Sequence, residues 1–266
     1  MCSHVSKILN VYTLNQGCTQ PASILLDDES KAVFKYPQNP MGIIVLFNEY
    51  ITYCIAKAIN LCIPEFGIAV VDDETQLDEE LSKTYPLMLF KGTGFYCSFI
   101  QKSVPVSAKI LKYACNLNET GKIILLDHIV KNSDRYSENM RLEMSGPSPK
   151  MYIIDHSHAL GDPDWDTTTL SLCDSKSPYI WRENFELYTL LINAGANVTP
   201  DTLGADCEFI QAHITEEVLD GIFSSVPSVW REAIGEFNVK HAQHYILNRV
   251  KNLQTICQTI NKERGV

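Results

Sequence analysis

Residues 123–139, IILLDHIVKNSDRYSEN, lead from an apolar segment into a polar loop, and residues 151–155, MYIID, form an apolar run that ends in an acid. The loop carries Asp134 and Asn139, and the apolar run predicts a strand that ends in Asp155. Phosphoryl transfer needs a carboxylate that accepts the proton of a hydroxyl and oxygen ligands that bind a divalent cation. Each residue alone is typical of a turn or a strand end. Together they predict a site with Asp134 as the base and Asn139 and Asp155 as metal ligands.

The N-terminal region supplies a lysine and a glutamate that could complete such a site. Lys35 lies at the end of the predicted strand 31–36, KAVFKY, and Glu49 follows within the apolar segment 42–61, whose periodicity predicts a helix. A solvated lysine and a surface glutamate are the ordinary alternatives. However, a charge within so apolar a helix needs a partner, because burying an unpaired charge is costly. We therefore expect Lys35 to pair with Glu49 and to reach phosphate groups.

The loop 15–23, NQGCTQPAS, joins two β-rich runs and contains Gly17, Thr19 and other small polar residues. Backbone N–H groups of such a loop can bind phosphate oxygens. A tight hairpin without any ligand is an equally good interpretation. Gly17 and Thr19 are the phosphate-loop candidates.

The periodicity of the sequence changes near residue 101. Short β-rich runs dominate before it, at 7–14, 22–28, 31–36, 66–73 and 95–101. Helical patterns dominate after it, at 108–116, 119–132, 183–195, 215–226 and 240–264. The sequence therefore predicts an α+β protein with a small β-rich lobe over residues 1–101 and a larger helical lobe over residues 102–266.

Composition excludes several classes of protein. A net charge of −10 over 266 residues argues against direct nucleic-acid binding or a general affinity for anionic membranes, which need clustered cations. The nine cysteines include no C-x-x-C pair, so neither a disulfide framework nor a zinc site is expected. The N-terminus lacks the apolar core of a signal peptide, and no apolar run approaches the roughly 20 residues that span a bilayer. We expect a cytoplasmic protein with no membrane association.

Taken together, the segments 31–73, 123–139 and 151–160 resemble the HipA-like kinases, a bacterial branch of the protein-kinase-like fold. The resemblance extends over residues from about 12 to 165. Its most specific parts are the helix around Asn48, Glu49 and Tyr50 and the Asp-Arg pair at 134 and 135. It implies a two-lobed protein-kinase-like fold and an activity that uses ATP and Mg²⁺.

The resemblance also implies roles for residues of the β-rich lobe. Lys35 would contact the nucleotide phosphates, with Glu49 as its partner. Adenine would lie against residues 95–100, FYCSFI, at a hinge between the lobes. Cys97 and Phe99 are the base-binding candidates in that segment.

For the helical lobe, the resemblance implies that Asp134 is the catalytic base and that Arg135 orients the catalytic loop. Asn139 and Asp155 would bind Mg²⁺. The acceptor would be a hydroxyl group, on a protein Ser or Thr or on a small molecule, and a regulatory protein partner is an open alternative.

The match to the family is incomplete at three places. Many relatives have a His after the Asp-Arg pair and a Gly before the Asn, whereas this chain has Tyr136 and Glu138. The phosphate loop has one Gly where relatives often have two. A catalytically weak pseudokinase that serves as a nucleotide-dependent binding module is therefore the alternative function.

A metal-dependent phosphohydrolase is a third interpretation. Imidazole and carboxylate groups together can hold two metal ions, and such groups gather in the same motifs at His128, His156, His158, Asp127, Asp134 and Asp155. This hypothesis leaves Lys35 and Glu49 unexplained. We expect instead that His128 lies on a helix face and that His156 and His158 hydrogen-bond the catalytic loop.

Overall fold

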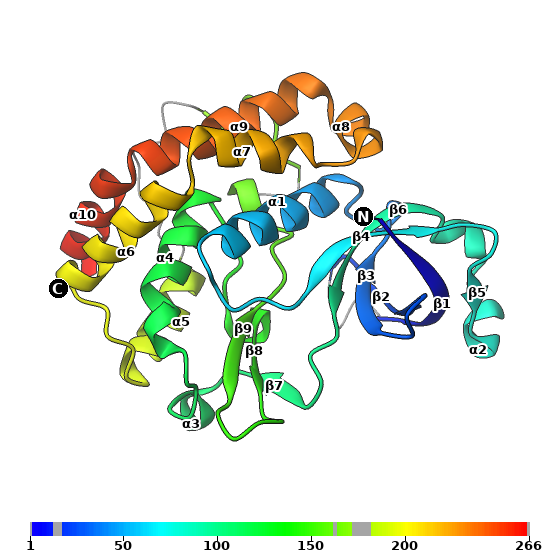
Figure 1. Ribbon diagram of the computed structural model, residues 1–266, viewed down its shortest axis with the longest axis horizontal. Coiled ribbons are helices and arrows are strands. Elements are labelled where there is room, and N and C mark those ends of the chain that lie inside the picture. Colours follow the sequence, from blue (N-terminus) through cyan, green and yellow to red (C-terminus); the bar gives the residue numbers. More distant parts are fainter. Residues whose placement is uncertain (1, 13–17, 162–163, 172–181, 265–266) are drawn as a thin grey trace.

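The computed structural model describes residues 2–12, 18–161, 164–171 and 182–264. Figure 1 shows the N-terminal strands at one end of the molecule, helices α6 (Pro200–His213) and α10 (Leu253–Arg264) at the other, and helix α1 (Ile44–Ala58) between them. The expected β-rich N-terminal region and helical C-terminal region are confirmed. The division into two lobes at residue 101 stays a prediction.

The first sheet has six strands within the described ranges. They are β1 (Ser3–Val11), β2 (Ala22–Leu26), β3 (Lys31–Lys35), β4 (Phe66–Val71), β5 (Gln76–Leu77) and β6 (Gly92–Ser98). Their order is β2-β3-β6-β4-β1-β5, and a further pairing between β1 and β2 closes five of them into a ring. The pairs of β1 with β4 and with β5 are parallel, and the others are antiparallel. Alternate apolar residues such as Ile8, Ile24 and Phe34 fill the core of this sheet.

The connection from β3 to α1 has a defined geometry. A Cβ added at Gly94 of β6 would lie 2.5 Å from the carbonyl oxygen of Lys35, so glycine allows the two strands their close approach. The buried side chain of Asn39 then organises the following turn by donating to the carbonyl oxygens of Tyr36 and Gly42 at 2.7 and 2.9 Å. The end of β3 is thereby held close to the start of α1.

Helix α1 is buried on most of its surface, with ten of its fifteen residues inaccessible to solvent. It packs against β6 and against two C-terminal helices, α7 (Glu216–Ser224) and α8 (Ser228–Ile234). The hydroxyl groups of Tyr50 and Ser225 lie 3.0 Å apart, and the indole N–H of Trp230 donates to the carbonyl oxygen of Thr93 in β6 at 2.8 Å. The C-terminal helices therefore hold α1 and the first sheet together.

A second sheet contains β7 (Ser103–Pro105), β8 (Met140–Glu143) and β9 (Lys150–Ile153), paired antiparallel in that order. The prediction that the last of these strands continues to Asp155 is wrong. Asp155 has φ = 53°, a left-handed conformation that cannot continue a strand. The acid lies instead two residues beyond the end of β9, just before the turn at residues 157–158.

The remaining helices complete the C-terminal region and the connections. The longer ones are α4 (Thr120–Ile129), α5 (Arg182–Asn193) and α9 (Glu236–Lys251). The short ones are α2 (Glu79–Ser82), α3 (Ala108–Leu111) and the 3₁₀ turns η2 (Leu87–Leu89), η3 (Leu117–Glu119), η4 (Ser137–Asn139) and η5 (Ala159–Gly161). Within the described ranges, no helix combines the length and the apolar character that crossing a bilayer demands.

Two helix predictions need correction. The segment 240–264 forms two helices rather than one, because α9 ends before Asn252, whose side-chain amide donates to the carbonyl oxygen of Asn248 at 2.7 Å. Such side-chain bonds compete with helix continuation. The segment 108–116 is helical only as far as Leu111. Helices α6 and α8 were not predicted, although the Thr199 cap and the proline in the first turn of α6 were usable signals.

Candidate active site

Lys35 and Glu49, both buried, form an ion cluster with the partly exposed Asp155. Lys35 ends β3, Glu49 lies on α1, and Asp155 follows β9. The ammonium group of Lys35 donates to Glu49 Oε1 and, at 2.8 Å, to Asp155 Oδ1. The second oxygen of Glu49 accepts the backbone N–H of His156 at 2.9 Å. The predicted pair of Lys35 and Glu49 is therefore present. Lys35 also contacts Asp155, the acid that the sequence predicts for the metal site.

The charges in this cluster stabilise one another. Burial alone would lower the pKa of Lys35, but the carboxylates of Asp155 and Glu49 raise it above its ordinary value. Burial would likewise raise the pKa of Asp155, but Lys35 lowers it well below its usual range. Burial raises the pKa of Glu49 to about 7, against the effect of Lys35. At neutral pH Asp155 therefore carries its charge beside Lys35, whereas Glu49 is only partly ionised.

The orientation of Asp155 is set by its neighbours. Its Oδ1 atom accepts Lys35 and, at 2.8 Å, the hydroxyl of Ser157. The backbone N–H of Ser157 also points at Oδ1, at 3.4 Å. All three contacts use Oδ1 of Asp155, so Oδ2 takes no part in them.

Asp134 and Asn139 face each other across the loop after α4. Nδ2 of Asn139 donates to the backbone carbonyl of Asp134 at 2.6 Å and to its Oδ2 at 3.1 Å. This arrangement directs the amide nitrogen toward Asp134 and leaves the amide oxygen for another ligand. Burial raises the pKa of Asp134, the charge of His158 opposes the rise, and the charge of Asp155 adds to it. Asp134 is therefore a stronger base than an exposed aspartate.

Arg135 is completely buried and connects this loop to the cluster. Its Nε and Nη2 atoms donate to Asp127 of α4 at 3.2 and 3.0 Å. Its Nη1 atom donates to the carbonyl oxygens of Asn139 and Ile154 at 3.2 and 3.0 Å. The second N–H of Nη2 donates to Nδ1 of His156 at 2.9 Å. His156 therefore carries its own proton on Nε2. All five donors of Arg135 are engaged between α4, the loop and the turn after β9.

Sequence reasoning missed two residues of α5 that support the loop. Asn184 accepts the backbone N–H of Arg135 at 2.9 Å and donates to the carbonyl oxygen of Asn132 at 2.8 Å. The hydroxyl of Tyr188 donates to Asp127 at 2.9 Å. Local spacing offered no signal for these contacts, because α5 begins more than forty residues after the loop.

Comparison with family models gives the family of this chain. A family model described as HipA-like kinase matches residues 5–174. The chain belongs to the HipA-like kinase family. The resemblance inferred from the motifs is thereby confirmed, and so is the class of enzyme, a phosphotransferase. No curated protein sequence matches this HipA-like kinase.

Several solved structures share the fold of this HipA-like kinase. The proinflammatory kinase CtkA of Helicobacter pylori has a TM-score of 0.60 and 13% identity, with 94% of this chain and 93% of that chain covered. Hydra Fam20 with sugar has a TM-score of 0.56 and 11% identity, with coverage of 98% and 88%. The Golgi casein kinase with Mn/ADP bound has a TM-score of 0.54 and 13% identity, with coverage of 99% and 75%. Identities this low establish a likeness of fold alone.

Four further residues are predicted to bind the nucleotide, namely Gly17, Thr19, Cys97 and Phe99. Gly17 lies outside the described residues, and Thr19 is buried within the turn that precedes β2. Cys97 of β6 lies close to the ion cluster, where burial and the charge of Glu49 raise the pKa of its thiol to about 12. Phe99 follows β6 and stacks under Lys31, whose ammonium lies 4.9 Å from the ring centre. A base-binding role for Cys97 and Phe99 stays a prediction.

The contacts of the histidines disfavour a phosphohydrolase. Nδ1 of His128 lies 2.7 Å from the carbonyl oxygen of Ile124 within α4, and His156 is bound to Arg135. Asp127 is bound to Arg135 and Tyr188. In the part of the chain that the structure describes, no group of three or more His, Cys, Asp or Glu residues could hold a metal ion. Three of the side chains that the hydrolase hypothesis needs are therefore engaged within the protein.

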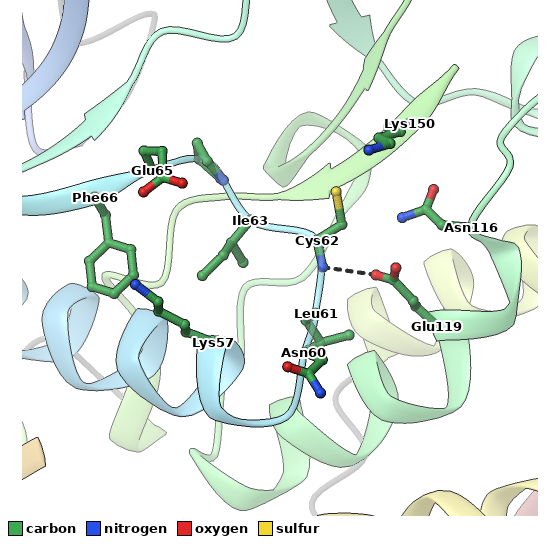
Figure 2. Close-up of a pocket in the computed structure, with 11 residues that line it drawn as sticks. Lys57, Asn60, Leu61, Cys62, Ile63, Glu65, Phe66, Asn116, Glu119 and Lys150 are labelled. Atoms are coloured by element: carbon green, nitrogen blue, oxygen red, sulfur yellow. Dashed lines mark hydrogen bonds between the residues drawn. The ribbon is translucent and has the colours of Figure 1, made fainter. Parts of the chain in front are cut away.

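A cavity of about 380 Å³ lies elsewhere, at the C-terminal end of α1 (Figure 2). Lys57, Cys62, Phe66, Glu119 and Lys150 contribute to its lining. The backbone N–H of Cys62 donates to Glu119 at 2.9 Å, which joins the turn after α1 to the start of α4. None of the residues predicted for the active site lines this cavity, so it is a place separate from the ion cluster.

Proposed function

We propose that this HipA-like kinase transfers the γ-phosphoryl group of ATP to a hydroxyl group with the help of Mg²⁺, and that the acceptor is a protein Ser or Thr. The observation that carries the proposal is the bridge from Lys35 to both Glu49 and Asp155. The loop with Asp134 is connected to the same place through Arg135. A cation for phosphate groups, a base and metal ligands are thus joined in one contact network.

In this proposal Lys35 binds phosphate oxygens of the nucleotide. A buried ammonium group that keeps its charge is suited to this role, because hydrogen bonds between charged groups are the stronger ones. Glu49 holds the ammonium in place through Oε1 and is itself held by the backbone of His156. The lysine is therefore positioned before the nucleotide arrives.

Asn139 and Asp155 would hold the Mg²⁺ ion. Mg²⁺ prefers hard oxygen ligands, and the amide oxygen of Asn139 and Oδ2 of Asp155 are the oxygens not used in the contacts described above. The carboxylate of Asp155, whose pKa lies well below its usual range, favours a cation there. When bound, Mg²⁺ would neutralise charge on the phosphate oxygens.

Asp134 would act as the base. Its carboxylate accepts the proton of the acceptor hydroxyl while the hydroxyl oxygen forms a bond to the γ-phosphorus and the bond from that phosphorus to ADP breaks. Burial raises the pKa of Asp134, which makes it a better proton acceptor. Arg135 keeps the loop in place without contacting the acceptor.

The proposals on cellular context rest on the family and on composition. A cytoplasmic bacterial kinase with a protein acceptor is the simplest inference from the HipA-like family. Direct binding to nucleic acid is not proposed, because the net charge is −10. Regulation by a protein partner is a hypothesis separate from the proposed reaction.

A catalytically weak binding module is the second candidate function. The observation that favours it is Glu138, an exposed acid in η4 next to Asn139, where it adds negative charge beside the proposed metal site. Tight, metal-dependent ATP binding without turnover would support the module.

The test is a pair of measurements on the purified full chain. ATP titration with and without Mg²⁺ measures affinity, and incubation with labelled ATP and a cell lysate measures transfer to protein. Label on Ser or Thr residues that depends on Mg²⁺ is the expected result. Absence of both metal-dependent binding and transfer would overturn the proposal.

A further inference from the structure

Asn48 lies on α1, and its side chain is fully buried. Its amide nitrogen donates to the carbonyl oxygens of Ser157 at 2.8 Å and Ala159 at 2.9 Å. Its oxygen accepts the indole N–H of Trp165 at 2.9 Å. Both donors of this amide and its acceptor are thus bound to the segment that follows Asp155.

Ser157 extends this contact to the carboxylate of Asp155. The hydroxyl of Ser157 donates to Asp155 Oδ1 at 2.8 Å, and the same oxygen accepts Lys35. A change in the position of the Ser157 backbone would therefore change the direction in which the carboxylate points. Asn48 fixes that backbone by donating to the carbonyl oxygen of Ser157.

The segment needs such support, because its conformation is unfavourable by itself. Asp155 and Leu160 have φ values of 53° and 63°, a left-handed conformation that side chains other than glycine rarely adopt. The carbonyl groups of a buried turn also need donors. At the far end, the backbone N–H of Leu160 donates to the carbonyl oxygen of Val130 at 2.6 Å. Asn48 supplies the donors in the middle.

We propose that Asn48 is a positioning residue that sets the orientation of the Asp155 carboxylate, with Trp165 holding the amide of Asn48 in the required rotamer. Helix α1 then supports the site with two adjacent side chains. Glu49 holds Lys35, and Asn48 holds the turn that carries Asp155. This inference rests on the proposed function only where it assigns a metal to Asp155.

A purely stabilising role for Asn48 is the competing explanation, and α1 offers a control for it. Thr52 is one turn further along the helix and is also fully buried. Its hydroxyl has no hydrogen-bond partner among the described residues. Thr52→Val therefore changes a buried side chain of the same helix without removing a contact to the turn.

The experiment compares Asn48→Leu, Trp165→Phe and Thr52→Val in the full chain. The first removes all three hydrogen bonds, and the second removes only the one from the indole. Phenylalanine keeps an aromatic ring against Phe47, whose ring centre lies 5.7 Å from that of Trp165. Trp165→Phe also provides a milder variant if Asn48→Leu does not fold. The first measurement is hydrogen exchange of the amides of Ala159 and Leu160 without ligand, and the second is the Mg²⁺ concentration that gives half-maximal phosphoryl transfer.

We expect faster exchange at these two amides and a Mg²⁺ requirement raised about 10- to 100-fold in Asn48→Leu, the range found when groups that orient metal ligands are lost. Trp165→Phe should change both quantities in the same direction by a smaller factor, and Thr52→Val should change neither. Equal exchange in Asn48→Leu and Thr52→Val would overturn the inference. So would an unchanged Mg²⁺ requirement in Asn48→Leu. If the wild type transfers no phosphoryl group, the proposed function fails, whereas the exchange measurement still decides whether Asn48 holds the turn.

Discussion

Lys35 Nζ lies 2.8 Å from Asp155 Oδ1, although the two residues are 120 positions apart in the sequence. The same ammonium group donates to Glu49. A single lysine thus joins the end of β3, helix α1 and the turn after β9. Because the three charges share contacts, a change at one of them alters the energy of the others.

Asp155→Asn should abolish phosphoryl transfer and remove most of the Mg²⁺-dependent part of ATP affinity. Asparagine has the same size but lacks the negative charge that attracts the cation and that pairs with Lys35. Calorimetric titration of ATP with and without Mg²⁺ measures the effect. An Asp155→Asn protein that keeps the wild-type affinity for Mg²⁺-ATP would exclude Asp155 from the metal site.

Lys35→Met and Glu49→Gln should each lower kcat/KM for ATP. The double variant should lose less transition-state stabilisation than the two single variants lose together. The expected difference is about 0.5–3 kcal/mol in a double-mutant cycle on kcat/KM, as for residues in direct contact. The exposed pair of Lys83 and Glu80 is the control, and its cycle should show no measurable coupling. Additive losses at Lys35 and Glu49 would mean that the two residues act independently.

Asp134→Asn should lower kcat by about 10²- to 10⁴-fold and leave ATP affinity nearly intact, because the amide cannot accept the proton of the acceptor but keeps the shape of the loop. Asn139→Ala should harm both kcat and Mg²⁺-ATP binding, because it deletes a metal ligand and the hydrogen bonds to Asp134. Turnover and nucleotide affinity of the two variants provide the comparison. Wild-type turnover in Asp134→Asn would refute its assignment as the base.

Arg135→Met should destabilise the fold by about 3–5 kcal/mol, because it leaves the buried carboxylate of Asp127 without its ionic partner. The free energy of unfolding from urea titration measures the loss. Arg231→Met is a control that breaks a partly exposed pair with Glu236 and should cost at most about 1 kcal/mol. A similar cost for both variants would mean that Arg135 is not the central contact of the loop.

His4 should make stability depend on pH. Its ring nitrogens each lie 2.9 Å from a carboxylate, of Asp27 and of Asp72, and hydrogen bonds to Asp72 and then Asp27 raise the pKa of His4. Because the pKa is higher in the folded than in the unfolded state, these contacts stabilise the fold fully below about pH 6.5 and are lost as the pH rises through the folded value.

The difference in unfolding free energy between wild type and His4→Gln should therefore be larger at pH 5.5 than at pH 8.5. Thermal unfolding at both pH values, with the variant as reference, removes the contribution of other groups. A difference that grows toward high pH would contradict the direction expected for His4.

Two contacts of the candidate site could be predicted from the sequence, because their signals are local. The apolar segment around Glu49 predicted a buried helix, and a charge there required a partner, which the structure shows to be Lys35. The spacing of Asp134 and Asn139 placed both in one loop, where they contact each other. Such inferences need only the periodicity of a segment and the cost of burying a charge.

The supports of the site could not be predicted in this way. Asn184 contacts the backbone of Arg135 from 49 residues away, and Asn48 contacts Ser157 from 109 residues away. Asn48 stands beside Glu49 in an apolar helix, but that pattern does not say which group its amide will contact. Nothing in the local sequence shows which distant carbonyl or N–H group will lie opposite an amide side chain.

The sequence by itself thus determined most of the helices and strands, the family, and the chemical groups that follow β3 and β9 and lie in the loop after α4. Only the tertiary structure decided that Lys35 contacts both Glu49 and Asp155, that Arg135 uses all its donors inside the protein, and that Asp155 has a left-handed conformation beyond its strand. The physical reason is one of range. Hydrophobic periodicity acts within a segment, whereas the hydrogen bonds of buried polar groups are completed only when segments distant in the sequence pack against one another.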